Sequence, residues 1–100
     1  GEENIPDPGF YLEFFPNPFR VNTTVSFNIS RKDAKNADIE IYNIKGQKIK
    51  SFSNLQIDET PNQQVIWDGK DDQNRKISSG IYFVRITAGE WNYQKRIVRY

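Results

Sequence analysis

The acidic side chains of this 100-residue chain are densest in the stretch "WDGKDDQN", which poses the question of a calcium site. Asp68, Asp71, Asp72 and Asn74 fall within seven positions. A calcium loop of the EF-hand type needs oxygen ligands at alternate positions, but Lys70 takes the second of these and no acid occupies the closing position. Asp and Asn also bond their own backbone in turns. The stretch therefore predicts a turn, without a metal or a cofactor.

The other acids could in principle carry out catalysis as a pair. With no Cys and no His in the chain, thiol and imidazole chemistry, disulfides and the usual zinc sites are excluded. Two carboxylates suffice for glycoside hydrolysis. However, Asp38, Glu40, Asp68 and Glu90 fall in predicted turns or on outward faces of predicted strands, and a domain this small offers little depth for a cleft. We therefore predict that the domain is not an enzyme.

Aromatic side chains provide a third kind of chemistry, the stacking of sugar rings. Trp91 and Tyr93 alternate on one face of the last predicted strand, and a flat aromatic platform is how many modules hold a glycan. The competing interpretation is that these rings pack as cross-strand pairs within a small core. We favour packing, and keep a carbohydrate-binding accessory module as an alternative function.

Charge and hydropathy limit the partners of the chain. A net charge of +1 gives no field to attract nucleic acid, and no apolar run approaches the ~20 residues of a membrane span. Residues 1–9 are acidic, contain Pro6, Pro8 and Gly9, and lack the features of a signal peptide. We expect them to be a linker from an upstream domain, with Gly1 compatible with a cloning scar. Residues 10–100 would then form one domain.

Alternation of apolar and polar residues predicts strands at 10–15, 24–30, 37–43, 47–53, 63–69, 80–86 and 91–100. The run 80–86 is apolar on both faces, which predicts a central strand covered on two sides. We expect residues 32–38 and 54–62 to be loops. The apolar residues on the inward faces are the expected core: Val25, Phe27, Ile29, Ile39, Ile41, Trp67, Tyr82, Val84 and Ile86.

Seven short strands with regular turn signals and no helix predict an all-β fold, an immunoglobulin-like β-sandwich of about seven antiparallel strands. Two residues support the immunoglobulin-like form. Trp67 lies on a middle strand, and Tyr82 follows the turn residue Gly80. In domains of this class a buried Trp packs at this level, and such a Tyr donates its hydroxyl to a backbone carbonyl upstream.

Four segments in order resemble a known family: "FPNPFRVNTTVSFNIS", "IEIYNIKGQKIKSF", "VIWDGKDDQNRKISSGIYFVRITAG" and "YQKRIVRY". They are similar to the C-terminal sorting domains of bacterial type IX secretion, and to the related immunoglobulin-like domain of the flagellar hook-capping protein. The similarity covers residues 12–100. It departs from the family at Phe15, where a Tyr is usual, at Arg20-Val21, where Asn-Pro is usual, and at Asn74, where a Gly is usual.

The resemblance implies a non-catalytic signal at the end of a larger cargo protein, exported through the periplasm to the cell surface or the medium. It implies as partners the outer-membrane secretion machinery and a surface sortase-like protease. The matching positions are the candidate sorting signal: Pro16, Asn17, Pro18, Gly80, Tyr82, Lys95, Arg96, Ile97, Val98 and Arg99. A structural assembly module of the hook-cap type is a further alternative.

The last eight residues, "YQKRIVRY", place Lys95, Ile97 and Arg99 on one face of a strand and Arg96, Val98 and Tyr100 on the other. Each face mixes charge with an apolar side chain, which is typical of an edge strand. We therefore expect the same residues to be the final strand and part of the signal that the machinery reads.

Overall fold

The computed structural model describes residues 10–29, 35–57 and 63–100, so the expected linker at 1–9 lies outside the described residues. The described residues form seven strands and no helix, and none of them could cross a membrane as a helix. The strands are β1 (Tyr11–Phe15), β2 (Thr23–Asn28), β3 (Asn36–Tyr42), β4 (Lys48–Gln56), β5 (Gln63–Trp67), β6 (Gly80–Ala88) and β7 (Trp91–Arg99).

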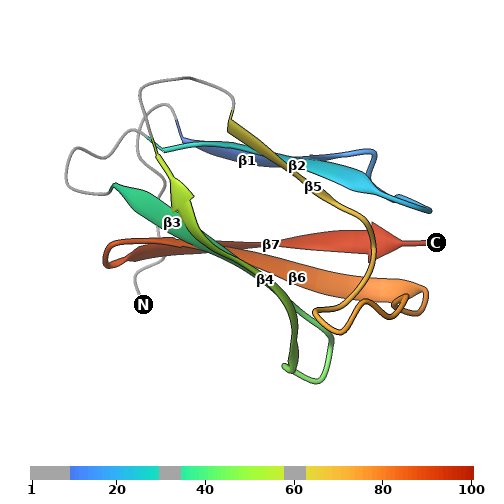
Figure 1. The fold of residues 1–100 in the computed structure, drawn as a ribbon. Helices are drawn as coiled ribbons and strands as arrows, with labels where there is room; N and C mark the ends of the chain where they lie inside the picture. Colours follow the sequence, from blue (N-terminus) through green and yellow to red (C-terminus); the bar gives the residue numbers. More distant parts are fainter. Residues whose placement is uncertain (1–9, 30–34, 58–62) are drawn as a thin grey trace.

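These strands make two antiparallel sheets that face each other (Figure 1). The first sheet has the order β1-β2-β5, and the second has the order β4-β3-β6-β7. The expected all-β sandwich of seven antiparallel strands is therefore confirmed. β1 and β7 are both edge strands, which for β7 confirms the prediction from its mixed faces.

The core lies between the two sheets, where alternate residues of each strand meet. All nine residues expected in the core are buried. The alternation missed six further buried apolar residues: Leu12, Phe14, Phe19, Ala37, Ala88 and Ile97. At the centre, the ring of Trp67 lies 5.2 Å from that of Phe19 and 6.2 Å from that of Tyr82, measured between centroids.

Three expectations about the second sheet were wrong in part. β6 is central, but its outer face carries no second layer of described residues, and Ile81 is 40% exposed there. Its apolar outer residues lie against strand neighbours instead, since Phe83 is flanked by Tyr42 and Arg96 in register. The expected loop at 54–62 is also shorter, because β4 continues to Gln56.

The extension of β4 depends on a local irregularity. The pairing of β3 with β4 shifts register near Asp38, whose Oδ1 accepts the N–H of Asn54 at 2.8 Å. Asn54 adopts a φ of 59°, which few residues other than Gly and Asn tolerate. The other expected loop, 32–38, was wrong at its end, because β3 begins at Asn36. Residues 32–34 of that loop lie outside the described ranges.

The acidic stretch after β5 is a turn, as its composition predicted. Asp71 Oδ1 accepts the N–H groups of Gln73 and Arg75, both at 2.9 Å, and Asn74 takes the left-handed conformation. The Arg75 N–H holds the pKa of the Asp71 carboxyl below its ordinary value. Within the described ranges, no three acidic side chains gather as a metal site would require.

Candidate functional site

The Pro-Asn-Pro segment and the end of the last strand, 80 residues apart in sequence, lie side by side at one end of the sandwich. Phe19 forms a parallel bridge with Arg99, in a sandwich whose strands otherwise pair antiparallel. Arg99 in turn pairs with Gly80 of β6. Parts of all three candidate signal segments thus meet here, and we call residues 16–20 and 96–100 the junction.

Three hydrogen bonds to the backbone of Val98 and Tyr100 hold the junction together. The side chain of Asn17 accepts the N–H of Val98 at 3.1 Å. Phe19 donates its N–H to Val98 O at 3.0 Å and accepts the N–H of Tyr100 at 2.9 Å. The outer edge of β7 is therefore paired at its end, even though no complete strand lies beside it.

Buried groups anchor the Pro-Asn-Pro segment from beneath. The Phe19 side chain is 1% exposed and packs on Trp67. The hydroxyl of the fully buried Thr23 donates to Pro16 O at 2.8 Å. Gly69 approaches so closely that a Cβ there would lie 2.9 Å from Val21 O, at a φ of +73°. Any larger residue at position 69 would therefore displace the backbone at Val21 and press on the Phe19 ring.

The candidate residues of β7 divide between the two faces of the strand. Ile97 lies opposite Tyr82 and is fully buried, so it belongs to the core. Lys95 is on the same face, where its Nζ donates to Leu12 O of the other sheet at 2.8 Å and closes the edge between β1 and β7. Arg96 and Val98 are on the outer face, and the Arg96 side chain is exposed.

Cations at the junction have no acidic partner among the described side chains. Lys48, Lys50 and Arg75, elsewhere in the domain, are all in ion pairs. By contrast, the Arg20 guanidinium lies 4.7 Å from the ring centroid of Tyr100, and Arg99 donates to Tyr100 O at 2.9 Å. With exposed Phe15, Val21 and Tyr100 nearby in the chain, the junction presents uncompensated positive charge beside apolar side chains.

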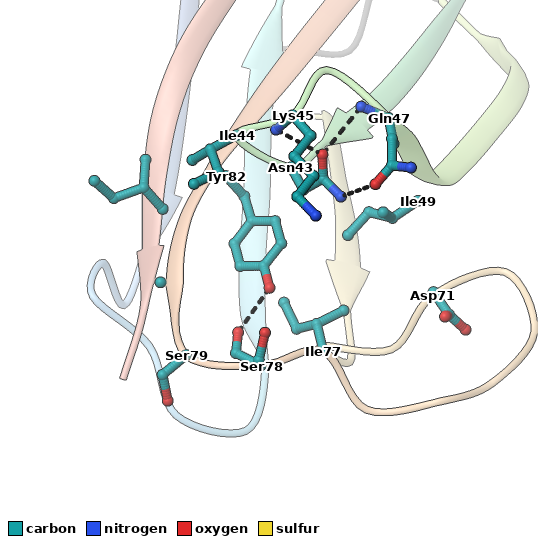
Figure 2. A pocket seen from close by; sticks show the side chains of 12 residues that line it. Asn43, Ile44, Lys45, Gln47, Ile49, Asp71, Ile77, Ser78, Ser79 and Tyr82 are labelled. Carbon is teal, nitrogen blue, oxygen red and sulfur yellow. Dashed lines mark hydrogen bonds between the residues drawn. The ribbon is translucent and has the colours of Figure 1, made fainter.

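Tyr82 and Gly80 border an open pocket on the other side of the strand end, between the β3–β4 hairpin and residues 77–82 (Figure 2). The pocket has a volume of about 400 Å³. Tyr82 donates its hydroxyl to Ser78 O at 2.7 Å, the upstream backbone bond predicted from sequence. Because Tyr82 is only 6% exposed, this bond fixes residues 77–82 from the interior of the domain.

The hairpin wall of this pocket is built on Asn43. Its Oδ1 accepts the N–H groups of Lys45 and Gln47 at 2.9 and 3.0 Å, as Figure 2 shows. Gly46 follows at a φ of +81°, which supplies the left-handed step that the tight turn needs. The pocket therefore lies between a rigid hairpin and a backbone-bonded loop, next to the junction.

The aromatic pair considered for sugar binding faces the interior. The rings of Trp91 and Tyr93 are parallel within 6°, but both are only partly exposed. Phe10 packs edge-on against them, with centroid distances of 4.7 and 5.0 Å. Phe10 therefore covers part of both rings, which favours packing against the core over a platform for a glycan.

Comparison with protein families decides the identity of the fold. The family model described as "Secretion system C-terminal sorting domain" matches residues 13–99. The chain belongs to this family. A sorting domain directs type IX secretion, so a protein that carries this one is exported to the cell surface or the extracellular space, and neither the sugar-binding nor the hook-cap alternative is favoured.

Solved structures agree with the fold of the sorting domain. Dimeric latent PorU from Porphyromonas gingivalis aligns with a TM-score of 0.73 at 22% identity, covering 88% of this chain and 9% of that one. PorZ, a surface component of the type IX secretion system of the same organism, aligns at 0.64 and 16%, covering 89% and 11%. The sorting domain thus spans about a tenth of each protein. No curated protein matches its sequence.

The geometry changes the role of several candidate residues in the sorting domain. Asn17 and Val98 are bonded to each other, Ile97 and Tyr82 are buried, and Lys95 bonds Leu12 O at the edge of the sandwich. Sequence reasoning missed Gly69, Arg20 and the burial of Phe19, which complete the junction. All three lie within the quoted segments, but no periodicity shows that Gly69 approaches Phe19 and Val21.

Replacing Asn17 with Ala should lower the free energy of unfolding by about 1 kcal/mol, because the Val98 N–H loses its acceptor. The effect should be local, with faster amide hydrogen exchange at Val98 and Tyr100. Chemical denaturation and exchange measured by NMR would check this. Asn17→Asp keeps the acceptor and is the matched control; equal exchange at Val98 in both variants would contradict the assignment.

Proposed function

We propose that the domain is a non-catalytic export signal, read by the outer-membrane secretion machinery and then removed by a surface sortase-like protease. A cargo domain would precede it in the same chain. The main support is the junction, where the Pro-Asn-Pro segment and the end of β7 form one surface through the Asn17 and Phe19 bonds to Val98. The recognised feature is therefore the folded junction and not a linear peptide.

Within the junction, we assign recognition to the exposed groups. Arg20 and Arg96 are exposed and lack acidic partners among the described side chains, so their charge is available to a receptor. The exposed Tyr100 adds an aromatic ring beside the Arg20 guanidinium. Val98 adds an apolar contact on the face that carries Arg96. Pro16, Pro18 and Gly80 shape the backbone around them, Ile97, Arg99 and Tyr82 support it from inside, and Lys95 holds the edge of the sandwich at Leu12 O.

The proposal also accounts for the position of the attachment point. Phe10, the first described residue, packs against Trp91 and Tyr93 at the start of β7. Tyr100 lies beyond the other end of β7, so the two ends of the domain are separated by the length of a nine-residue strand (Figure 1). A cargo attached before Phe10 would leave the junction uncovered for a receptor.

A reporter fusion tests the function directly. A periplasmic reporter joined to residues 10–100 should reach the cell surface or the medium in a bacterium with the type IX system. The same fusion in a strain lacking that system should stay in the periplasm, as should the reporter alone. Retention of the folded fusion in the secreting strain would overturn the proposal.

A further inference from the structure

The central strand β6 has an apolar face that no described element covers. Its sequence is apolar on both sides, yet only its inner face lies in the core. On the face that turns away from the first sheet (Figure 1), Ile81 is 40% exposed and Phe83 is partly exposed. Val98 of β7 lies beside Ile81 in register and is partly exposed as well. The uncovered residues therefore form one group across β6 and β7.

Two guanidinium groups flank Phe83 on this face. Arg96 lies directly across from Phe83 on β7, and Arg85 follows Phe83 by two positions on β6. Arg85 and Arg96 are therefore diagonal neighbours on paired strands, a relation that places residues ~7–8 Å apart. Long side chains reach across such a separation, so one anionic group between the two arginines is within reach of both. We call Phe83, Arg85 and Arg96 the outer patch.

The charges around these two arginines do not balance. The acid beside them is Glu40, directly across from Arg85 on β3. Glu40 accepts the Tyr42 hydroxyl at 2.7 Å and pairs with Lys48 at 3.4 Å. The Tyr42 bond and the Lys48 charge hold the pKa of the Glu40 carboxyl below its ordinary value, so it is ionised at neutral pH. Neither Arg85 nor Arg96 is in an ion pair in the described part of the chain. Three cations less one acid leave two positive charges.

A hollow beside the arginines offers room for an apolar side chain. It lies between the β3–β4 hairpin and the outer faces of β6 and β7, and its volume is about 230 Å³. Tyr42, Ile44 and Phe83 supply its apolar wall, and Arg85 and Gln94 border it. Sites for small molecules measure ~300–1,000 Å³, so this hollow fits one side chain better than a whole ligand.

We propose that the outer patch binds a segment of a partner protein that carries a carboxylate and, beside it, an apolar side chain. The carboxylate lies between Arg85 and Arg96, and the apolar side chain packs on Phe83 in the hollow. Aromatic residues and arginine are enriched at the energetic centres of protein interfaces. For the identity of the partner, the inference rests on the proposed function: the segment belongs to the receptor that reads Arg96 and Val98.

Other anionic or apolar occupants fit the outer patch less well. Asp38 and Glu40 lie on the same face of the sheet, so a uniformly anionic surface such as a membrane would be repelled beside the arginines. The net charge of +1 also gives no long-range attraction to such a surface. In a symmetric contact, a second copy of the domain would bring its own two arginines against this pair. A short segment with a single carboxylate avoids both kinds of repulsion.

Titration of the full 100-residue chain with a short peptide tests the site. The probe is acetylated and amidated Gly-Ser-Glu-Ser-Leu-Ser-Gly, which in an extended form projects Glu and Leu from one face. We expect saturable NMR shift changes at Phe83, Arg85 and Arg96, including the side-chain N–H signals of both arginines. The same peptide with Gln in place of Glu should bind about tenfold more weakly or less, because the charge-assisted hydrogen bonds are lost.

Variants of the chain locate the carboxylate. Arg85→Gln and Arg96→Gln each remove one guanidinium and should each weaken binding of the Glu peptide by about tenfold. Neither should alter binding of the Gln peptide, and a merely structural effect would not produce this difference. Lys76→Gln is the matched control, because it makes the same change in net charge at an exposed residue outside the outer patch. Melting temperatures check the folding of all three, and the exposed Arg96 keeps the test valid if Arg85→Gln lowers stability.

Three results would overturn the inference. The first is the absence of shift changes at the outer patch up to millimolar peptide, or equal binding of the Glu and Gln peptides. The second is binding to phosphatidylglycerol vesicles, without binding to the peptide, that Arg96→Gln abolishes; this would assign the face to a membrane. The third is self-association of the peptide-free chain in analytical ultracentrifugation that Arg96→Gln abolishes, which would assign the face to a second copy.

The reporter fusion separates failure of this inference from failure of the export proposal. Peptide binding by a domain whose fusion stays in the periplasm of the secreting strain would contradict the export proposal alone. Normal export without peptide binding would contradict this inference alone. When both hold, Arg85→Gln should lower the amount of surface reporter, and Lys76→Gln should leave it unchanged.

Discussion

Replacing Trp67 with Ala should lower the free energy of unfolding by about 3 to 5 kcal/mol. The side chain is fully buried between the Phe19 and Tyr82 rings, and its Nε1 donates to Lys70 O at 2.9 Å. The change therefore leaves a cavity and an unpaired carbonyl at once. Because domains of this size have about 5 to 15 kcal/mol in total, much of the stability would be lost. Urea denaturation would measure this loss, with circular dichroism of the backbone as the signal because tryptophan fluorescence changes with the substitution.

The neighbouring residue on the same strand is the control for this prediction. Ile66 faces solvent, so Ile66→Ala should change stability by less than about 0.5 kcal/mol. The Trp67 variant should also loosen the junction, since Phe19 rests on the indole. Amide exchange at Val98 should therefore accelerate together with global unfolding. A Trp67→Ala protein as stable as Ile66→Ala would show that the core is not centred on this ring.

The parts of this fold that sequence predicts are those in which a single strand carries its own pattern. Val25, Phe27 and Ile29 alternate with polar residues and are buried as expected. Turn positions are also local, since Gly46 and Asn74 have the positive φ that their residue types allow. In each case the physical cause lies within a few residues, so the sequence displays it directly.

The parts that sequence does not predict depend on contacts between distant segments. Phe19 sits in a stretch without alternation, and its burial follows from Trp67, 48 positions later. From the sequence pattern alone, Lys95 is expected to be a solvated cation. In the structure its ammonium donates a hydrogen bond to Leu12 O across the edge of the sandwich. The end of β4 was missed because Asp38 on another strand accepts the Asn54 N–H. These partners are identifiable only once the topology is known.

Reversing the charge of Arg96 should abolish most export of the reporter fusion while leaving the domain folded. The side chain is exposed on the outer face of β7 and pairs with no acid among the described side chains, so Arg96→Glu should alter stability by less than about 0.5 kcal/mol. A like-charge contact at an interface costs several kcal/mol. We therefore expect surface reporter to fall by about tenfold or more, measured by quantitative immunoblotting of cell fractions.

The matched control is Lys35→Glu, which makes the same change in net charge at an exposed residue next to β3, away from the junction. Normal export of this variant would show that position matters. Equal loss in both variants, or none in Arg96→Glu, would contradict a role for Arg96 in recognition.

Charge reversal is more informative than the simpler deletion of residues 95–100. That deletion removes the fully buried Ile97 and both backbone partners of Phe19, Val98 O and the Tyr100 N–H. A truncated domain would therefore fail to export through unfolding alone, whether or not the machinery reads these residues. Arg96 and Lys95 are adjacent but face opposite sides of the sheet, so substitution at Arg96 separates recognition of the junction from its stability.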